Sequence, residues 1–257
     1  MFKSIIFFTL IVFSMTAHAQ LKLVGNKVET FIYDDQEPAR LMRVVETALD
    51  NAGIEYSLTS TTQAWSGSGL RSGKYNGYID HYSLNEENAR YVYSNTYATI
   101  ALHVASRKQG TLLINRFDQL TGQRIGIEKR FANTDRLRSE RTVNWARRDS
   151  FHENIQQLSE GRVDYVLADK LMLAEINKLL IAVDEEPLII SERPILKVQI
   201  KLAVNQEVDG AMTLLNKFDA AINKMRNQEI FDEIYLPAAS APSILDPALY
   251  SEILRKW

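Results

Sequence analysis

The sequence predicts an α/β protein built as two related lobes, and two observations support this. Strand-like and helix-like patterns alternate along the chain, which is typical of a mostly parallel sheet covered by helices. One short pattern also occurs twice, at 70–79 and 158–167: leucine, glycine, a basic residue, Asn or Asp, and an apolar run. Each copy is typical of a helix that ends at a glycine and leads through a tight turn into a buried strand. Gly73 and Gly161 are 88 positions apart, which is too long for a solenoid repeat and suits two lobes with a ligand cleft between them.

The other elements are predicted from the period at which apolar residues recur and from residues, such as glycine, that end a helix. Residues 22–33 contain one or two short strands, and 41–52 carry an apolar stripe of helical period that ends at Gly53. Residues 54–59 alternate as a strand does, and 97–106 are apolar and β-branched. Further strands are expected at 75–82, 124–127, 163–167 and 196–204, and further helices before Gly73, before Gly161 and at 170–180. A long C-terminal helix is expected to carry Met212, Leu215, Phe218, Ile222 and Met225 on one face.

The N-terminus predicts export. Lys3, the apolar run 5–13 and the small-x-small triplet 17–19 are typical of a signal peptide, residues 1–19, that is cleaved to leave 20–257. The alternative is a retained membrane anchor, although the run is short for one. The chain has no cysteine, which excludes disulfides, thiol catalysis and a lipid-modified cysteine. We therefore expect an exported protein, periplasmic in a Gram-negative host.

Composition excludes some partners. Lys and Arg number 30 against 32 Asp and Glu, for a net charge of −2 without a basic block, so no nucleic-acid partner is expected. The mature chain has only His81, His103 and His152, without the spacing of metal ligands. No cofactor and no metal site are expected, and we expect a monomer.

Four motifs, in order, carry a resemblance to a known family. They are Trp65 with Ser-Gly-Lys-Tyr-Asn-Gly at 72–77, Tyr-Ser-Asn-Thr-Tyr at 93–97, Leu-Thr-Gly-Gln-Arg-Ile-Gly-Ile at 120–127, and Gly-Arg-Val-Asp at 161–164 with Asp169. In these motifs the chain resembles the bacterial extracellular solute-binding proteins of family 3, which mostly serve ABC importers of polar amino acids. The resemblance implies a periplasmic-binding-protein type II fold. Its first lobe would comprise 20–104 and 197–257 and its second lobe 105–196, joined by two hinge strands near 102–106 and 194–198.

The resemblance also implies ligand-binding residues. Asp169 stands where the family places the carboxylate that binds a ligand ammonium, at the end of a parallel strand. It would equally suit the N-cap of the helix from Lys170. For the ligand anion there are two candidates, Arg90 and Arg130. Arg90 lies three residues after the family's arginine position, about one helical turn, and Arg130-Phe131 replaces the family's helix-opening Gly-Thr. Either arginine could instead be a solvated surface residue.

Three further candidates depart from the family pattern. Tyr33 is an aromatic wall for the ligand or packs on the first helix. Trp65 is a wall or lid, or otherwise a half-buried packing residue. Ser83 offers a hydroxyl to the ligand, or it starts a capped helix with Glu86 three residues later.

Three functions remain open. The first is a receptor that captures a small polar solute by hinge closure and hands it to a permease. The second is a signalling or orphan binding module that docks on a membrane sensor, with 237–257 as a contact segment or as a strap packed on the first lobe. The third is a dehydratase-like enzyme that uses a buried carboxylate among Asp34, Asp35, Asp80 and Asp169.

Overall fold

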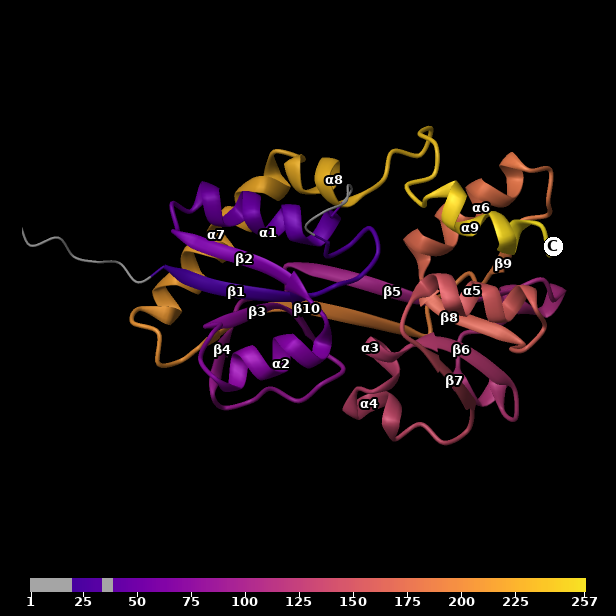
Figure 1. Ribbon diagram of the computed structural model, residues 1–257, viewed down its shortest axis with the longest axis horizontal. Coiled ribbons are helices and arrows are strands. Elements are labelled where there is room, and N and C mark those ends of the chain that lie inside the picture. Colours follow the sequence, from indigo (N-terminus) through magenta and orange to yellow (C-terminus); the bar gives the residue numbers. More distant parts are fainter. Residues whose placement is uncertain (1–19, 34–38) are drawn as a thin grey trace, which may run out of the picture.

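The computed structural model describes residues 20–33 and 39–257 (Figure 1). The expected signal peptide and Asp34 and Asp35 lie outside these described residues. No helix within the described ranges is long and apolar enough to span a membrane.

The described part of the chain forms a ten-stranded sheet that runs through both halves of the molecule. Along its main path the strand order is β2-β1-β3-β10-β5-β8-β6-β7, while β4 pairs with β10 and β9 with β5. The strands are β1 (Leu21–Asn26), β2 (Tyr56–Thr61), β3 (Gly77–Tyr82), β4 (Tyr91–Tyr93), β5 (Ala98–Ser106), β6 (Arg124–Glu128), β7 (Asn144–Arg148), β8 (Tyr165–Asp169), β9 (Ile189–Ile190) and β10 (Leu196–Asn205).

Helices cover the sheet on both sides (Figure 1). The α-helices are α1 (Arg40–Asn51), α2 (Gln63–Arg71), α3 (Lys129–Ala132), α4 (Asp135–Arg138), α5 (Phe151–Ser159), α6 (Lys170–Ala182), α7 (Ala211–Asn227), α8 (Ile230–Tyr235) and α9 (Pro247–Leu254). Two 3₁₀ turns, η1 (Gln109–Leu113) and η2 (Phe117–Leu120), follow β5.

The molecule has two lobes joined by two long strands (Figure 1). The first lobe holds β1–β4 with α1, α2, α7 and α8, and the second lobe holds β6–β9 with α3–α6. Strands β5 and β10 pair with each other in antiparallel fashion, and β5 continues into the second lobe, where it pairs with β8. The α/β, two-lobed fold with two crossing strands is therefore confirmed.

The repeated pattern forms the same structure in each lobe. Helix α2 leads through Gly73 into β3, and α5 leads through Gly161 into β8. Both glycines have positive φ, 75° and 66°, a backbone conformation that a side chain disfavours. Strand β3 pairs in parallel with β1 and β8 with β6, so the sequence repeat is a repeat of helix, left-handed turn and parallel strand.

Two expectations are wrong. Residues 83–90 form turns, so the capped helix that was one of the two roles considered for Ser83 does not form. The C-terminal segment, residues 237–257, does not pack on the first lobe, because α9 contacts α5 and α6 of the second lobe. Its buried side chains Leu245, Tyr250 and Ile253 join the second lobe's core, so the assignment of all of 197–257 to the first lobe fails over this segment.

Candidate functional site

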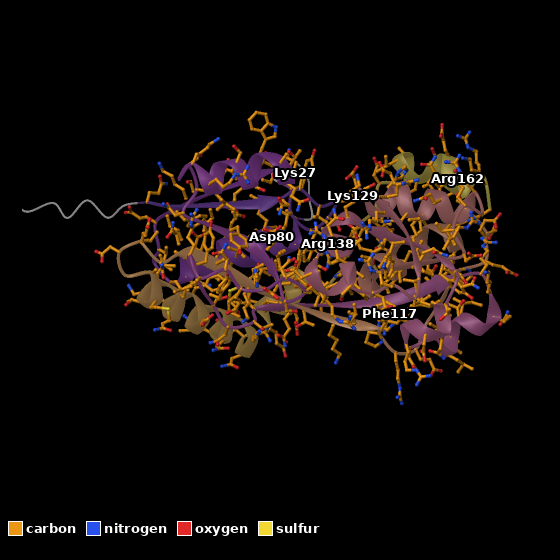
Figure 2. All side chains as sticks on the ribbon, turned by 90° about the horizontal axis from the view of Figure 1, so that it is seen from below. Lys27, Asp80, Phe117, Lys129, Arg138 and Arg162 are labelled. Carbon is orange, nitrogen blue, oxygen red and sulfur yellow. The ribbon has the colours of Figure 1, made fainter. Side chains whose placement is uncertain are left out.

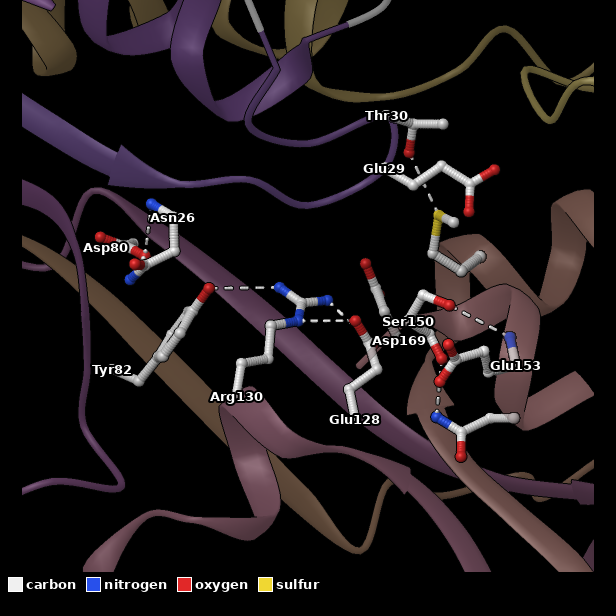
Figure 3. Close-up of polar contacts among 12 residues, drawn as sticks. Asn26, Glu29, Thr30, Asp80, Tyr82, Glu128, Arg130, Ser150, Glu153 and Asp169 are labelled. Atoms are coloured by element: carbon white, nitrogen blue, oxygen red, sulfur yellow. Dashed lines mark hydrogen bonds and ion pairs between the residues drawn. The ribbon is translucent and has the colours of Figure 1, made fainter. Parts of the chain in front are cut away.

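A narrow cleft lies between the lobes, and its cavity volume is about 50 Å³. The first lobe supplies the turn after β1 and the start of α1, and the second supplies the ends of β6 and β8 and the starts of α5 and α6 (Figure 3). The lining residues are Lys27, Val28, Glu29, Phe31, Arg40, Glu128, Arg130, Asp149, Ser150, Phe151, Asp169 and Met172. Of the residues expected to bind ligand, Arg130 and Asp169 are in this cleft.

Asp169 is buried at the end of β8 and points into the cleft (Figure 3). Its Oδ1 accepts a hydrogen bond of 3.1 Å from the backbone N–H of Leu171, so it does cap α6. Its Oδ2 lies 3.8 Å from Nη2 of Arg40 in the first lobe. Burial raises the pKa of Asp169, and Arg40 and the Leu171 N–H oppose that rise. The cap and the cleft position therefore coexist.

Arg40, which faces Asp169 across the cleft, is among the lining residues that the sequence analysis did not predict. It begins α1, is 1% exposed, and donates from Nη1 to the backbone oxygen of Tyr235 at 3.1 Å. Its guanidinium lies 5.4 Å from the ring centres of both Phe31 and Tyr235. Its Nε has no hydrogen-bond partner among the described residues. A signal existed in the sequence, because Arg40 falls four residues before Val44, on the apolar face of the helix.

Arg130 crosses to the first lobe, but it is held by protein partners. Its Nε and Nη2 donate to the two carboxylate oxygens of Glu128 at 2.9 and 3.1 Å, and its Nη1 donates to the Tyr82 hydroxyl at 3.2 Å. The ring of Phe131 lies 4.2 Å from its guanidinium. Burial alone would lower the pKa of Arg130, but the Glu128 carboxylate outweighs burial and the pKa is raised. Arg130 is therefore a charged contact between the lobes.

The mouth of the cleft is also bridged by side chains. The Thr30 hydroxyl of the first lobe donates to the Met172 sulfur of α6 at 3.2 Å (Figure 3). Lys27 of the first lobe and Lys129 of the second lie on either side of the boundary between the lobes, and Lys129 pairs with Asp149 at 2.9 Å (Figure 2). Both lobes thus place charged groups at the entrance.

The aromatic candidates are not brought into the cleft. Trp65 is 71% exposed on α2 and lines a separate surface depression with Ser68 and Tyr75, so the half-buried packing expected for it is also wrong. The ring of Tyr33 lies 4.5 Å from Nζ of Lys27 and is not among the residues that line the cleft.

Ser83 and Arg90 have other contacts. The Ser83 hydroxyl accepts from the backbone N–H of Gln199 at 2.9 Å and therefore fixes the turn to β10. Arg90 is exposed in a turn, where its backbone N–H donates to Asn88. Because no helix forms at 83–90, the argument that one helical turn returns Arg90 to the cleft is wrong.

One buried carboxylate lies beside the cleft without lining it. Asp80 on β3 accepts from the backbone and side-chain nitrogens of Asn26 at 3.3 and 2.7 Å through Oδ2, while its Oδ1 has no hydrogen-bond partner among the described residues. Burial raises its pKa to about 6, and the bonds from Asn26 limit the rise. In the part of the chain that the structure describes, no three His, Asp or Glu side chains cluster as metal ligands would.

Comparisons with known proteins give the fold its class. No protein-family model matches the chain, and no curated protein matches it. The GluR0 ligand-binding core in complex with L-glutamate matches with a TM-score of 0.68 at 10% identity, over 85% of this chain and 97% of that one. The amino acid ABC transporter substrate-binding protein AbpA from Streptococcus pneumoniae, bound to L-arginine, matches at 0.60 and 13% identity, over 91% and 95%. A histidine kinase sensor domain with similarity to periplasmic binding proteins matches at 0.62 and 15% identity, over 84% and 94%. The chain therefore has the two-lobed periplasmic-binding-protein fold, in a widely diverged sequence.

Proposed function

We propose that this chain is an exported binding protein that captures a small zwitterionic ligand, of the amino-acid type, between its lobes. The observation that carries the proposal is the pair Arg40 and Asp169, one from each lobe, facing each other at 3.8 Å in a buried cleft. A guanidinium binds a carboxylate, and a carboxylate binds an ammonium, so the pair complements the two ends of an α-amino acid.

Arg40 and Asp169 are each suited to exchange the other for a charged group of the ligand. A separation of 3.8 Å exceeds the 2.7–2.9 Å typical of a charge-assisted hydrogen bond, so each group keeps bonding capacity. The unpartnered Nε of Arg40 adds a buried donor on the same side of the cleft. In the proposed mechanism the lobes open about β5 and β10, the ligand enters between the two charges, and its bonds to both lobes stabilise the closed state.

Arg130 has a different role in this proposal. With three of its donors engaged by Glu128 and Tyr82, it closes one side of the cleft instead of binding the ligand anion. The dehydratase alternative loses Asp80 as its acid or base, because that side chain bonds to Asn26 and does not line the cleft. Asp169 does line the cleft, and in this proposal its carboxylate binds the ligand ammonium. The similar structures reported above are binding cores and a sensor domain, and we propose no enzymatic activity.

Two settings suit such a binding protein. AbpA, a transporter component, supports a periplasmic receptor that delivers its ligand to an ABC permease. The sensor domain supports docking on a membrane sensor, and the attachment of the C-terminal segment to both lobes favours this second setting. Neighbouring genes separate them: permease and ATPase genes favour transport, and a sensor kinase gene favours signalling.

The test is a thermal-shift screen of residues 20–257 against free amino acids and their N-acetylated forms, followed by calorimetry. A ligand at a hundred times its Kd adds about 2.7 kcal/mol, which is about 5–10 °C in Tm for a chain of this size. We expect a free amino acid to bind, its N-acetylated form to bind weakly, and Asp169→Asn to remove that discrimination. Trp65→Ser serves as the control and leaves affinity unchanged. If no amino acid binds, or if Asp169→Asn keeps full affinity, the proposal is wrong.

A further inference from the structure

The C-terminal segment makes a third connection between the lobes, in addition to β5 and β10. Helix α8 ends at Tyr235 in the first lobe, where it contacts α1, and the chain then crosses to α9 on the second lobe (Figure 1). Both ends of this crossing are bonded by residues that line the cleft. At the start, Arg40 donates to the backbone oxygen of Tyr235, and in α9 the Tyr250 hydroxyl donates to Oε2 of Glu29 at 3.0 Å.

The attachment of α9 to the second lobe is extensive. Tyr250 is fully buried, and Leu245 and Ile253 are 1% exposed, all within the second lobe's core. Polar contacts add to this attachment: Glu175 accepts from the backbone N–H of Ile244 at 2.9 Å, and His152 bonds to the backbone oxygen of Leu249 at 3.1 Å. The segment therefore moves with the second lobe when the lobes separate.

Among residues 20–33 and 39–257, α9 is attached to the first lobe by one hydrogen bond, from the Tyr250 hydroxyl to Glu29 at the cleft mouth. Glu29 lies in the turn after β1 and lines the cleft, so the Tyr250–Glu29 hydrogen bond exists only while the lobes are together. Residues 236–246 could extend to about 36–40 Å as a chain, so the covalent connection itself does not prevent opening. Opening breaks this hydrogen bond and leaves the Glu29 carboxylate without its donor.

We propose that the C-terminal segment is a latch that holds the cleft closed through Tyr250 and Glu29. This inference concerns the regulation of the cleft described under the proposed function. It implies that whatever displaces α9, such as a docked membrane partner, favours the open cleft. The contribution of one hydrogen bond to a carboxylate corresponds to about a 10- to 100-fold change in the ratio of closed to open molecules.

The latch can be tested without any ligand. Because the chain has no cysteine, Met212→Cys on α7 and Leu113→Cys on η1, both exposed, give one spin label in each lobe. Double electron–electron resonance then measures the distribution of distances between the lobes. We expect Tyr250→Phe, which removes only the hydroxyl, to shift molecules toward the open distances, and Tyr91→Phe on β4, away from the cleft, to cause no shift.

A coupling measurement separates a latch from simple weakening of α9. If the hydroxyl acts on Glu29, then Tyr250→Phe and Glu29→Ala give the same shift, and the double variant shows no further shift. Additive shifts, or a distance distribution that Tyr250→Phe leaves unchanged, would overturn the latch. Either result leaves the proposed ligand binding untouched, because that proposal depends on the amino-acid screen.

Discussion

The buried Asp80 gives the most quantitative prediction, because its contribution to the free energy of unfolding depends on pH. Its pKa in the folded protein is about 6, against 3.8 for an ordinary aspartate. At about 1.4 kcal/mol per pKa unit, the difference amounts to about 3 kcal/mol. The folded state holds a proton between these two pH values that the unfolded state has released. This contribution to stability is therefore present at about pH 4 and is lost as the pH rises through 6.

The substitution Asp80→Asn keeps an oxygen that can accept from Asn26 and cannot ionise. Urea unfolding of residues 20–257, as wild type and variant, at pH 4.5 and pH 7.5 measures its effect on the free energy of unfolding. Comparing the free energies of unfolding of the two proteins at each pH cancels the contributions of the other groups that titrate in this range. At pH 4.5 about 1 kcal/mol of the difference has already been lost, so we expect the variant to gain about 2 kcal/mol relative to wild type between the two pH values.

The matched control is Asp209→Asn, at an exposed position in the turn before α7. It should show the same stability difference from wild type at both pH values. A constant difference for Asp80→Asn as well would contradict this prediction, since it would mean that the Asp80 carboxyl does not change protonation in this range.

Three further predictions concern stability. Arg40→Ala should cost about 3–5 kcal/mol because it leaves the Asp169 carboxylate buried without its partner, and Arg40→Met with Asp169→Leu should recover most of that loss in urea unfolding. Gly77→Ala should lower stability by about 2–4 kcal/mol, since its Cβ would lie 2.2 Å from the backbone oxygen of Ala203, and a fully stable variant would show that β3 and β10 separate readily. Trp65→Ser should change thermal stability by less than about 0.5 kcal/mol, and a larger loss would show that the exposed indole packs in solution.

The fold could be predicted because its signals are local. The apolar stripe of α1, the alternation in β2 and the glycines that end α2 and α5 each depend on residues within a few positions of one another. Asp169 was predicted from the resemblance to the family's motif, and its position at the carboxyl end of a predicted parallel strand, where ligands bind in open sheets, supported that prediction. The short strands β4, β7 and β9 were not predicted because, unlike the five-residue strands β6 and β8, they carry no run of buried apolar residues.

The rest of the site depends on contacts between distant parts of the chain. The position of the Arg40 side chain in the cleft depends on its contacts with Asp169 and Tyr235, and no sequence pattern around residue 40 indicates either partner. Arg90 was placed by assuming a helix, but Ser83 bonds to Gln199 of β10 and residues 83–90 turn instead. The apolar residues of the C-terminal segment predict burial in some core, whereas the choice of lobe is a property of the assembled structure.

The polar contacts across the cleft also determine how a ligand could act. Arg40 with Asp169, Arg130 with Tyr82, and Tyr250 with Glu29 each join the lobes, and each includes at least one buried group. A buried charge pair such as Arg40 with Asp169 contributes little net stability, because desolvation offsets most of its attraction. Each of the two hydrogen bonds to a charged group contributes about 1.5–3 kcal/mol. The population of the closed state can therefore respond to a ligand that prefers it by a few kcal/mol. A cleft sealed by large apolar surfaces would lack this property, since the hydrophobic contribution alone would hold it shut.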